Sequence, residues 1–125
     1  MAVILIVDDN PDACVPLARL MRVLGHKGEC VYSGEEALAF IEKNPVDLMI
    51  LDMMMPGMDG LEVLRHVRSN PATAKLQVVM FSAISDPKFR EHALQKGAND
   101  YWLKASLDFS QLQSRVGQFL NGPTA

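Results

Sequence analysis

The feature that most constrains the fold of this chain is a regular alternation of short apolar runs with segments of helical periodicity. The first run, Val3–Val7, is apolar throughout and rich in β-branched residues, which is typical of a parallel strand covered on both faces. Four further runs of strand length follow it. The expected strands are Val3–Val7, Glu29–Tyr32, Leu48–Leu51, Val78–Phe81 and Tyr101–Leu103.

The segments between these runs carry the start and stop signals of helices. Ser33 and Asp59 each precede a glutamate by three residues, which is the spacing of a capping box. Asp86 stands before a proline at the expected first helical position. Gly25 and Gly97 are placed to end the helices before them. Helices are therefore expected to connect the strands.

The first and last helices have features of their own. Pro16 lies inside the first, where its missing N–H is expected to bend the helix or delay its start. The last helix is expected to bury one apolar face. The residues of that face are Phe109, Leu112, Val116, Phe119 and Leu120.

Five strands that alternate with five helices predict right-handed crossovers, and hence a doubly wound parallel sheet of the α/β class. At 125 residues the chain is long enough for one domain with its own core. Ligands of such sheets bind beyond the carboxyl ends of the strands, near the point where the strand order reverses. The residues that follow each strand are therefore where a site is expected.

Polar and charged residues stand at the ends of most of these strands. They are Asp8 and Asp9 after the first strand, Asp52 after the third, Ser82 after the fourth and Lys104 after the fifth. Each has a structural explanation when taken alone, since Asp caps helices, Ser ends strands and an exposed Lys is solvated. Because the carboxyl ends of parallel strands share one edge of the sheet, we expect the five side chains to converge there.

A cluster of three carboxylates, one hydroxyl and one ammonium has the groups that phosphoryl transfer needs. Crowded carboxylates repel one another, so at least one should have a raised pKa unless a cation relieves the repulsion. Mg²⁺ suits such a site, because it binds one or two carboxylates together with waters and phosphate oxygens. A carboxylate can also attack phosphorus to form an aspartyl phosphate, while the ammonium and the hydroxyl contact the phosphoryl oxygens.

Four short motifs together resemble the receiver domain of two-component response regulators, which has the CheY-like fold. They are VDDN at 7–10, LDMMMPGMDG at 51–60, FSA at 81–83 and LK at 103–104. The resemblance covers nearly the whole chain and implies a flavodoxin-like sheet with the strand order 2-1-3-4-5. The expected organisation is a receiver domain over residues 1–121, followed by a C-terminal tail over residues 122–125.

The resemblance implies a role for each acidic residue of the cluster. Asp52 would accept the phosphoryl group and would also bind the metal. Asp9 would bind Mg²⁺ directly, whereas Asp8 would act largely through bound water. Met54 matches the position that gives the metal its backbone carbonyl, so the side chain there is free to vary.

Ser82 and Lys104 match the two positions that contact the phosphoryl oxygens, and Tyr101 matches an aromatic residue whose rotamer follows activation. Family members usually have a cis proline after the lysine, whereas Ala105 stands here. A cis bond before a residue other than proline costs about 2.5–4 kcal/mol, so the Lys104–Ala105 bond is expected to be trans. Ile84 occupies a position that often tunes the lifetime of the phosphoryl bond, which leaves the rates open.

These residues favour a receiver that takes a phosphoryl group from a histidine kinase or a histidine phosphotransfer protein onto Asp52 and slowly hydrolyses it. It would catalyse its own phosphorylation and dephosphorylation, although its main role would be signalling. Output would come from a protein that docks on the helix after Asp86, the strand Tyr101–Leu103 and the last helix. The alternatives are a receiver piece of a larger regulator, and a receiver that binds partners without being phosphorylated. A phosphatase of the haloacid dehalogenase type is excluded, because it needs Asp where Met54 stands.

Composition argues against several other classes of function. The net charge is −3 and no run of Lys and Arg occurs, so direct binding of nucleic acid is not expected. The opening apolar run is too short for a membrane span or a signal sequence. Cys14 and Cys30 are too few for a disulfide framework and are expected to be small buried hydrophobes in a reduced, cytoplasmic setting. The methionines at 53–55 are expected to fill the core or to face a partner.

Overall fold

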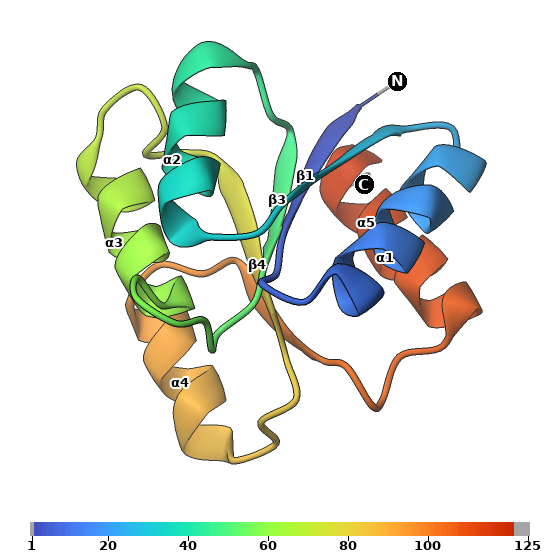
Figure 1. Ribbon diagram of the computed structural model, residues 1–125. Helices are drawn as coiled ribbons and strands as arrows, with labels where there is room; N and C mark the ends of the chain where they lie inside the picture. Colours follow the sequence, from blue (N-terminus) through green and yellow to red (C-terminus); the bar gives the residue numbers. More distant parts are fainter. Residues whose placement is uncertain (1, 122–125) are drawn as a thin grey trace.

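The computed structural model describes residues 2–121 and contains one parallel five-stranded sheet with the strand order β2-β1-β3-β4-β5 (Figure 1). The predicted fold class and strand order are therefore confirmed. The tail expected at 122–125 lies outside the described residues. The strands are β1 (Val3–Val7), β2 (Lys27–Val31), β3 (Leu48–Leu51), β4 (Gln77–Ser82) and β5 (Asp100–Leu103). The helices are α1 (Pro11–Val23), α2 (Gly34–Lys43), α3 (Gly60–Ser69), α4 (Pro87–Gln95) and α5 (Phe109–Asn121).

The helices cover both faces of the sheet. In Figure 1, α1 and α5 lie on one side of it and α2, α3 and α4 lie on the other. Each face has its own core: Ile4 and Ile6 belong to the cluster that contains Trp102, whereas Leu5 and Val7 belong to the other. Because side chains alternate along a strand, β1 supplies both cores, which explains why its sequence is apolar throughout.

Side-chain oxygens cap the helices where the sequence predicts. Ser33 Oγ accepts a hydrogen bond from the backbone N–H of Glu36 at 3.1 Å, and Asp59 Oδ1 accepts one from the N–H of Glu62 at 2.9 Å. The predicted start at Asp86 is confirmed as well. Each cap satisfies an N–H that the helix itself leaves without a partner, so the local sequence determines where these helices begin.

The start of α5 was only partly predicted. Asp108 Oδ1 accepts from the N–H of Gln111 at 2.9 Å, and Gln111 Oε1 accepts from the N–H of Asp108 at 3.0 Å, which is a reciprocal capping box. The prediction that Phe109 is buried is wrong, because its side chain is 53% exposed. Phe109 is the first residue of the helix and precedes by one turn Leu112, where α5 joins the core.

Two expectations near the N-terminus need correction. Helix α1 begins at Pro11, so Pro16 does not delay its start, and a bend at Pro16 stays a prediction. Strand β2 begins at Lys27 rather than at Glu29. The strand is longer because the N–H of Lys27 donates to the carbonyl oxygen of Ala2 at 2.8 Å, which extends the pairing with β1. This pairing is a long-range contact that the composition around Lys27 does not indicate.

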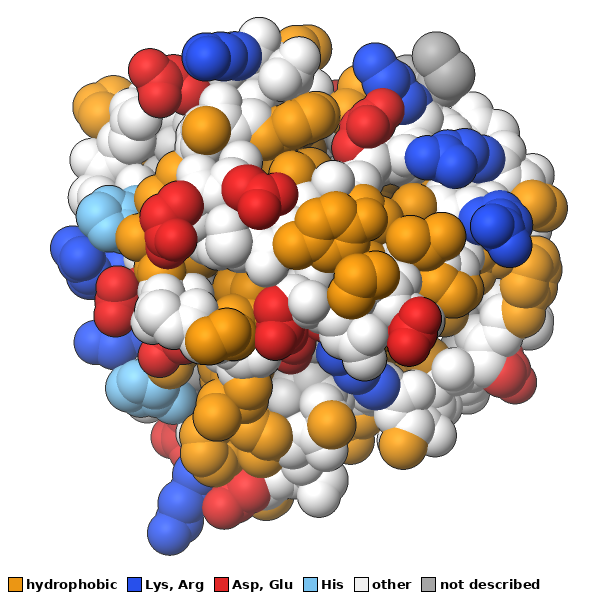
Figure 2. All heavy atoms as spheres, viewed as in Figure 1, with side chains coloured by type: hydrophobic (Ala, Val, Ile, Leu, Met, Phe, Trp, Pro, Cys, Tyr) orange, Lys and Arg blue, Asp and Glu red, His pale blue; other side chains and the backbone are white. Residues whose placement is uncertain are grey.

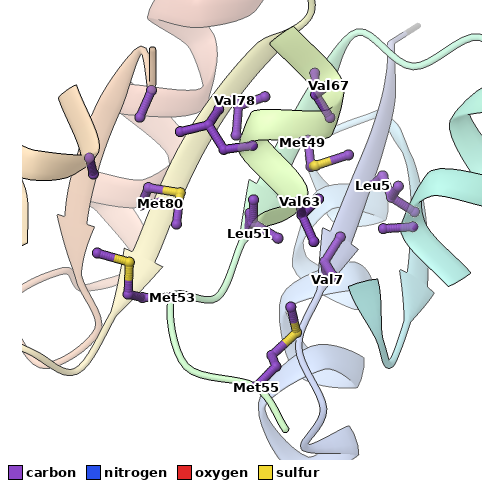
Figure 3. Packing of buried hydrophobic residues seen from close by; sticks show 14 of the residues in the cluster. Leu5, Val7, Met49, Leu51, Met53, Met55, Val63, Val67, Val78 and Met80 are labelled. Atoms are coloured by element: carbon purple, nitrogen blue, oxygen red, sulfur yellow. The ribbon is translucent and has the colours of Figure 1, made fainter. Parts of the chain in front are cut away.

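The three consecutive methionines divide between core and surface. Met53 and Met55 are buried in the cluster that Figure 3 shows, together with Leu51 and Met80. Met54 points outward and is 62% exposed. The first and third methionines therefore fill the core as expected, and contact of Met54 with a partner stays a prediction.

The backbone agrees with the other local predictions. Every peptide bond described by the structure is trans, including the one between Lys104 and Ala105. Gly25 and Gly97 have φ angles of 92° and 108°, which favour glycine, and they follow the ends of α1 and α4 as predicted. Cys14 is buried and hydrogen-bonds the carbonyl oxygen of Ile6 at 3.4 Å. No helix within residues 2–121 combines the length and the apolar character needed to cross a bilayer.

Candidate functional site

The three acidic residues predicted for the site converge at the carboxyl edge of the sheet. Asp8 follows β1 and Asp52 follows β3, and these two strands are neighbours at the point where the strand order reverses. With Asp9, they offer three carboxylate oxygens that all lie within 4.8 Å of one another. The structure therefore brings together the acidic cluster that the sequence predicts.

The backbone of the sheet sets the position of the two inner carboxylates. The N–H of Asp52 donates to the carbonyl oxygen of Val7 at 2.9 Å, which continues the pairing of β1 with β3 past the end of the strands. Asp8 and Asp52 are only 5% and 9% exposed, whereas Asp9 is exposed at the rim. The start of α3 packs closely against the backbone of Asp52, since a Cβ atom at Gly60 would overlap the carbonyl oxygen of Asp52. Residue 60 is therefore a glycine, because any side chain there would clash.

Lys104 reaches into the cluster from the end of β5. Its Nζ donates to Asp8 Oδ2 at 2.7 Å and lies 3.7 Å from Asp52 Oδ2. Its own N–H donates to the carbonyl oxygen of Ser82 at 2.8 Å, so the base of the side chain is held against β4. Burial alone would lower the pKa of Lys104, but the hydrogen bond with Asp8 and the charge of Asp52 outweigh it and raise that pKa. The ammonium therefore stays charged at neutral pH.

The pKa of Asp52 is raised, mainly because burial disfavours its charged form. The nearby charge of Lys104 lowers the pKa and the charges of Asp8 and Asp9 raise it again. The direction agrees with the expectation for one of the crowded carboxylates, but burial contributes more to it than repulsion between the carboxylates does. The charge of Lys104 thus compensates only part of the cost of burying the ionised Asp52.

Two hydrogen bonds connect Ser82 with Tyr101 through Ile84. Ser82 is 1% exposed, and its Oγ accepts from the N–H of Ile84 at 3.0 Å. The hydroxyl of Tyr101 donates to the carbonyl oxygen of the same residue, Ile84, at 2.8 Å. Tyr101 is 5% exposed, so its ring is held inside the protein. Ser82 and Tyr101 are therefore linked through one residue of the loop before α4.

The donor set fits a hard divalent cation. It consists of carboxylate oxygens, which Mg²⁺ prefers, and the exposed Asp9 leaves one side open for waters or phosphate oxygens. The cluster also carries more negative than positive charge, because one ammonium faces three carboxylates. In Figure 2, acidic side chains are scattered among hydrophobic and basic ones over the face that is shown.

The sequence profile described as the response regulator receiver domain matches residues 4–117 of this chain. The chain belongs to that family. Receiver domains of known structure share its whole architecture. CheY4 of Vibrio cholerae is 26% identical, with a TM-score of 0.89 over 96% of this chain and 99% of that one. The receiver domain of the sensor histidine kinase PA1611 from Pseudomonas aeruginosa is also 26% identical, with a TM-score of 0.87 over 97% and 98% of the two chains.

The receiver is also similar to part of longer regulators. The transcriptional regulatory protein ZraR of Salmonella typhimurium is 36% identical over 118 residues, which are 94% of this chain. The same residues are 26% of the ZraR length, so the receiver spans about a quarter of this relative.

Two features of this receiver site were not predicted from the sequence. The Lys104 ammonium lies closer to Asp8 than to Asp52. The ring of Phe81 lies beneath the same ammonium, with 5.9 Å between Nζ and the ring centroid. The contact between Phe81 and Lys104 could be found only with the register of β4 against β5, because in the sequence Phe81 looks like an ordinary core residue of β4. Met54 is at the predicted place beside Asp52, and the role of its carbonyl stays a prediction.

Proposed function

We propose that this receiver accepts a phosphoryl group on Asp52 from a phosphohistidine of a histidine kinase or a histidine phosphotransfer protein, in an Mg²⁺-dependent reaction. The observation that carries the proposal is the partly buried acidic cluster with a charged lysine beside it. Three carboxylate oxygens lie within 4.8 Å of one another, and Lys104 Nζ contacts the innermost of the carboxylates.

Hydrogen bonding supports Asp52 as the acceptor among the three. Asp8 has both oxygens occupied, Oδ1 by the N–H of Asn10 at 3.0 Å and Oδ2 by Lys104. The contacts of Asp52 are longer: the N–H of Met54 lies 3.4 Å from Oδ1, and Lys104 lies 3.7 Å from Oδ2. A carboxylate with weak contacts and a raised pKa has more available electron density, so Asp52 is the better nucleophile.

In the proposed reaction, an oxygen of Asp52 attacks phosphorus while the bond from phosphorus to the donor imidazole breaks. The electron pair of that bond goes to the imidazole nitrogen, which leaves. Lys104 shifts an N–H to a phosphoryl oxygen, and the Ser82 hydroxyl donates to another. Mg²⁺, held by Asp9, Asp52 and the Met54 carbonyl, with Asp8 acting through water, would supply positive charge against the phosphoryl oxygens. Later attack by water on phosphorus would break the bond from phosphorus to the Asp52 oxygen and release inorganic phosphate. The carboxylate would thus be restored, and the chain would catalyse its own slow dephosphorylation.

Two findings about relatives support this proposal. The PA1611 receiver is described with a magnesium ion coordinated in its active-site cleft. It is also a part of a histidine kinase, so receivers of this fold occur with the proposed phosphoryl donor. The alternative is that this chain is the receiver part of a longer transcriptional regulator. The likeness to ZraR favours that alternative.

Intact mass spectrometry after incubation with acetyl phosphate and Mg²⁺ tests the proposal. We expect one phosphoryl group to be added, and we expect none when EDTA replaces Mg²⁺. A chain that stays unlabelled with both acetyl phosphate and phosphoramidate would instead be a receiver that acts only as a binding module.

Mg²⁺ is predicted to stabilise the folded chain by mass action. Millimolar Mg²⁺ should add roughly 1 kcal/mol or more to the free energy of unfolding, if its concentration exceeds the dissociation constant several-fold. Urea unfolding with and without Mg²⁺ measures this increment. It should shrink sharply in Asp9→Ala, whose carboxylate is exposed and open to a cation, and less in Asp8→Ala, whose oxygens are already occupied. Equal losses in the two variants would contradict this division of roles.

Output is proposed to pass through the face formed by α4, β5 and α5, by docking of another protein. When the Ser82 hydroxyl turns to a phosphoryl oxygen, the bond that it accepts from Ile84 weakens, and the carbonyl of Ile84 is the group that holds Tyr101. A change at Ser82 would thus reach the loop that leads into α4. Tyr101 is the proposed switch.

Tyr101→Phe should separate switching from phosphorylation. The variant loses the 2.8 Å hydrogen bond to Ile84, which should lower the free energy of unfolding by about 1 kcal/mol. The labelling rate with acetyl phosphate should stay near that of the wild type, because Tyr101 is not in the acidic cluster. A large loss of labelling would place Tyr101 in the chemistry rather than downstream of it.

A further inference from the structure

Phe81 lies beside the site but has no part in the chemistry proposed above. It precedes Ser82 on β4 and is half-buried. The Nζ of Lys104 lies over its ring, 5.9 Å from the centroid, which is within the range of a cation–π interaction. In the pairing of β4 with β5, Phe81 is opposite Trp102 and Ser82 is opposite Leu103. Lys104 follows Leu103 directly, so it leaves the sheet close to Phe81.

The Lys104 ammonium lies near Asp8, Asp52 and the ring of Phe81. The next two residues, Ala105 and Ser106, are exposed and lie in a turn. A cavity of about 200 Å³ opens beside Lys104 and Phe81, and its walls include Leu17 and Ile50. Lys104 is thus part of the wall of this cavity. The position of the ammonium therefore depends on its ion pairs and on the ring of Phe81.

The ring of Phe81 is itself held firmly. Its edge-to-face contact with Trp102 has a centroid distance of 6.5 Å and an interplanar angle of 80°. Trp102 is 1% exposed, and its Nε1–H donates to Asp100 Oδ2 at 2.9 Å. On its other side Trp102 contacts Phe119 of α5, with 5.8 Å between the centroids. Phe81 is thus the end of a row of three aromatic rings that reaches from α5 to the site.

We propose that Phe81 is a positioning residue. Its ring holds the Lys104 ammonium over the acidic cluster while the N–H groups of that ammonium move from the carboxylates to a phosphoryl oxygen. An ammonium has three N–H donors. Asp8 accepts one at 2.7 Å, and Asp52 lies at 3.7 Å. Attraction to a ring face uses no donor, so an N–H remains for a phosphoryl oxygen. The contact between the ring and the ammonium exists without any phosphoryl group, whereas the effect of Phe81 on the labelling rate rests on the proposed function.

Three variants separate positioning from packing. Phe81→Leu keeps an apolar side chain and removes the ring, Phe81→Tyr keeps the ring, and Phe119→Leu removes the ring at the other end of the row. In proton NMR spectra of the unphosphorylated chain, the ring should shift the Lys104 side-chain methylene signals upfield. We expect this shift in the wild type, Phe81→Tyr and Phe119→Leu, and we expect its loss in Phe81→Leu.

The rate of labelling by acetyl phosphate at saturating Mg²⁺ gives the second readout. Phe81→Leu should be slower by about threefold to tenfold, while Phe81→Tyr and Phe119→Leu should stay within about twofold of the wild type. Equal slowing by Phe81→Leu and Phe119→Leu would reduce Phe81 to a packing residue, and unchanged Lys104 signals in Phe81→Leu would overturn the contact. A wild type that takes up no phosphate would refute the proposed function, and the NMR comparison would still decide whether Phe81 holds Lys104.

Discussion

Asp52→Asn should abolish the incorporation of phosphate from acetyl phosphate, because an amide oxygen in place of the carboxylate is a far weaker nucleophile. Asp59→Asn is the matched control. It makes the same change seven residues further on, in the same loop, at the N-cap of α3. Asn caps helices about as well as Asp, so this control should fold and be labelled like the wild type. Full labelling of Asp52→Asn would show that another group is the acceptor.

The same substitution should leave the Mg²⁺-free chain at least as stable as the wild type. The pKa of Asp52 is raised in the folded state, so folding favours the protonated form, and the ionised form costs stability at neutral pH. Asn removes that cost, and the melting temperature should be unchanged or higher by roughly a few degrees. As the pH falls below the unfolded value of about 3.9, the wild type becomes protonated and the difference should vanish. Thermal unfolding at pH 7 and near pH 3.5 measures both limits. A less stable Asn variant at pH 7 would contradict the argument.

Lys104→Met should have the largest effect on stability among the site variants. It leaves the carboxylate of Asp8, which is 5% exposed, without its ammonium partner. Removing one partner of a fully buried pair costs about 3–5 kcal/mol. The side chain of Lys104 is 28% exposed, so water screens part of the interaction, and we expect a loss of roughly 2–3 kcal/mol in urea unfolding at pH 7. Labelling by acetyl phosphate should also fall, by about 10²-fold or more.

The pH dependence of this loss has a definite sign. Because the pKa of Lys104 is raised in the folded state, its contribution is fully present below the pKa of an unfolded lysine, about 10.4. The contribution is lost only as the pH rises through the higher folded value. The difference between the wild type and Lys104→Met should therefore be steady around neutral pH. Lys75→Met, at an exposed position, should change stability by less than about 0.5 kcal/mol. A comparable loss in that control would exclude a specific role for the ion pair.

The sequence by itself determined the elements and the residues that end them. A parallel strand covered on both faces has to be apolar throughout, which marks β1 and β3 without any knowledge of their partners. Capping residues such as Ser33 and Asp59 mark helix starts because their contacts span only three residues. Since parallel strands share a carboxyl edge, the convergence of Asp8, Asp52 and Lys104 followed from the order of the elements. It was therefore predictable that these three residues belong to one site.

Only the tertiary structure decided how these groups interact. Lys104 and Asp8 are separated by 96 positions in the chain, and their 2.7 Å contact depends on strand register and on the path of each side chain. The raised pKa of Asp52 depends on burial by elements on both sides of it. The place of Phe81 under the ammonium and the exposure of Phe109 also depend on how distant segments of the chain pack together. Local patterns report periodicity and caps, whereas distances, burial and charge compensation arise from segments that meet only after the sheet has formed.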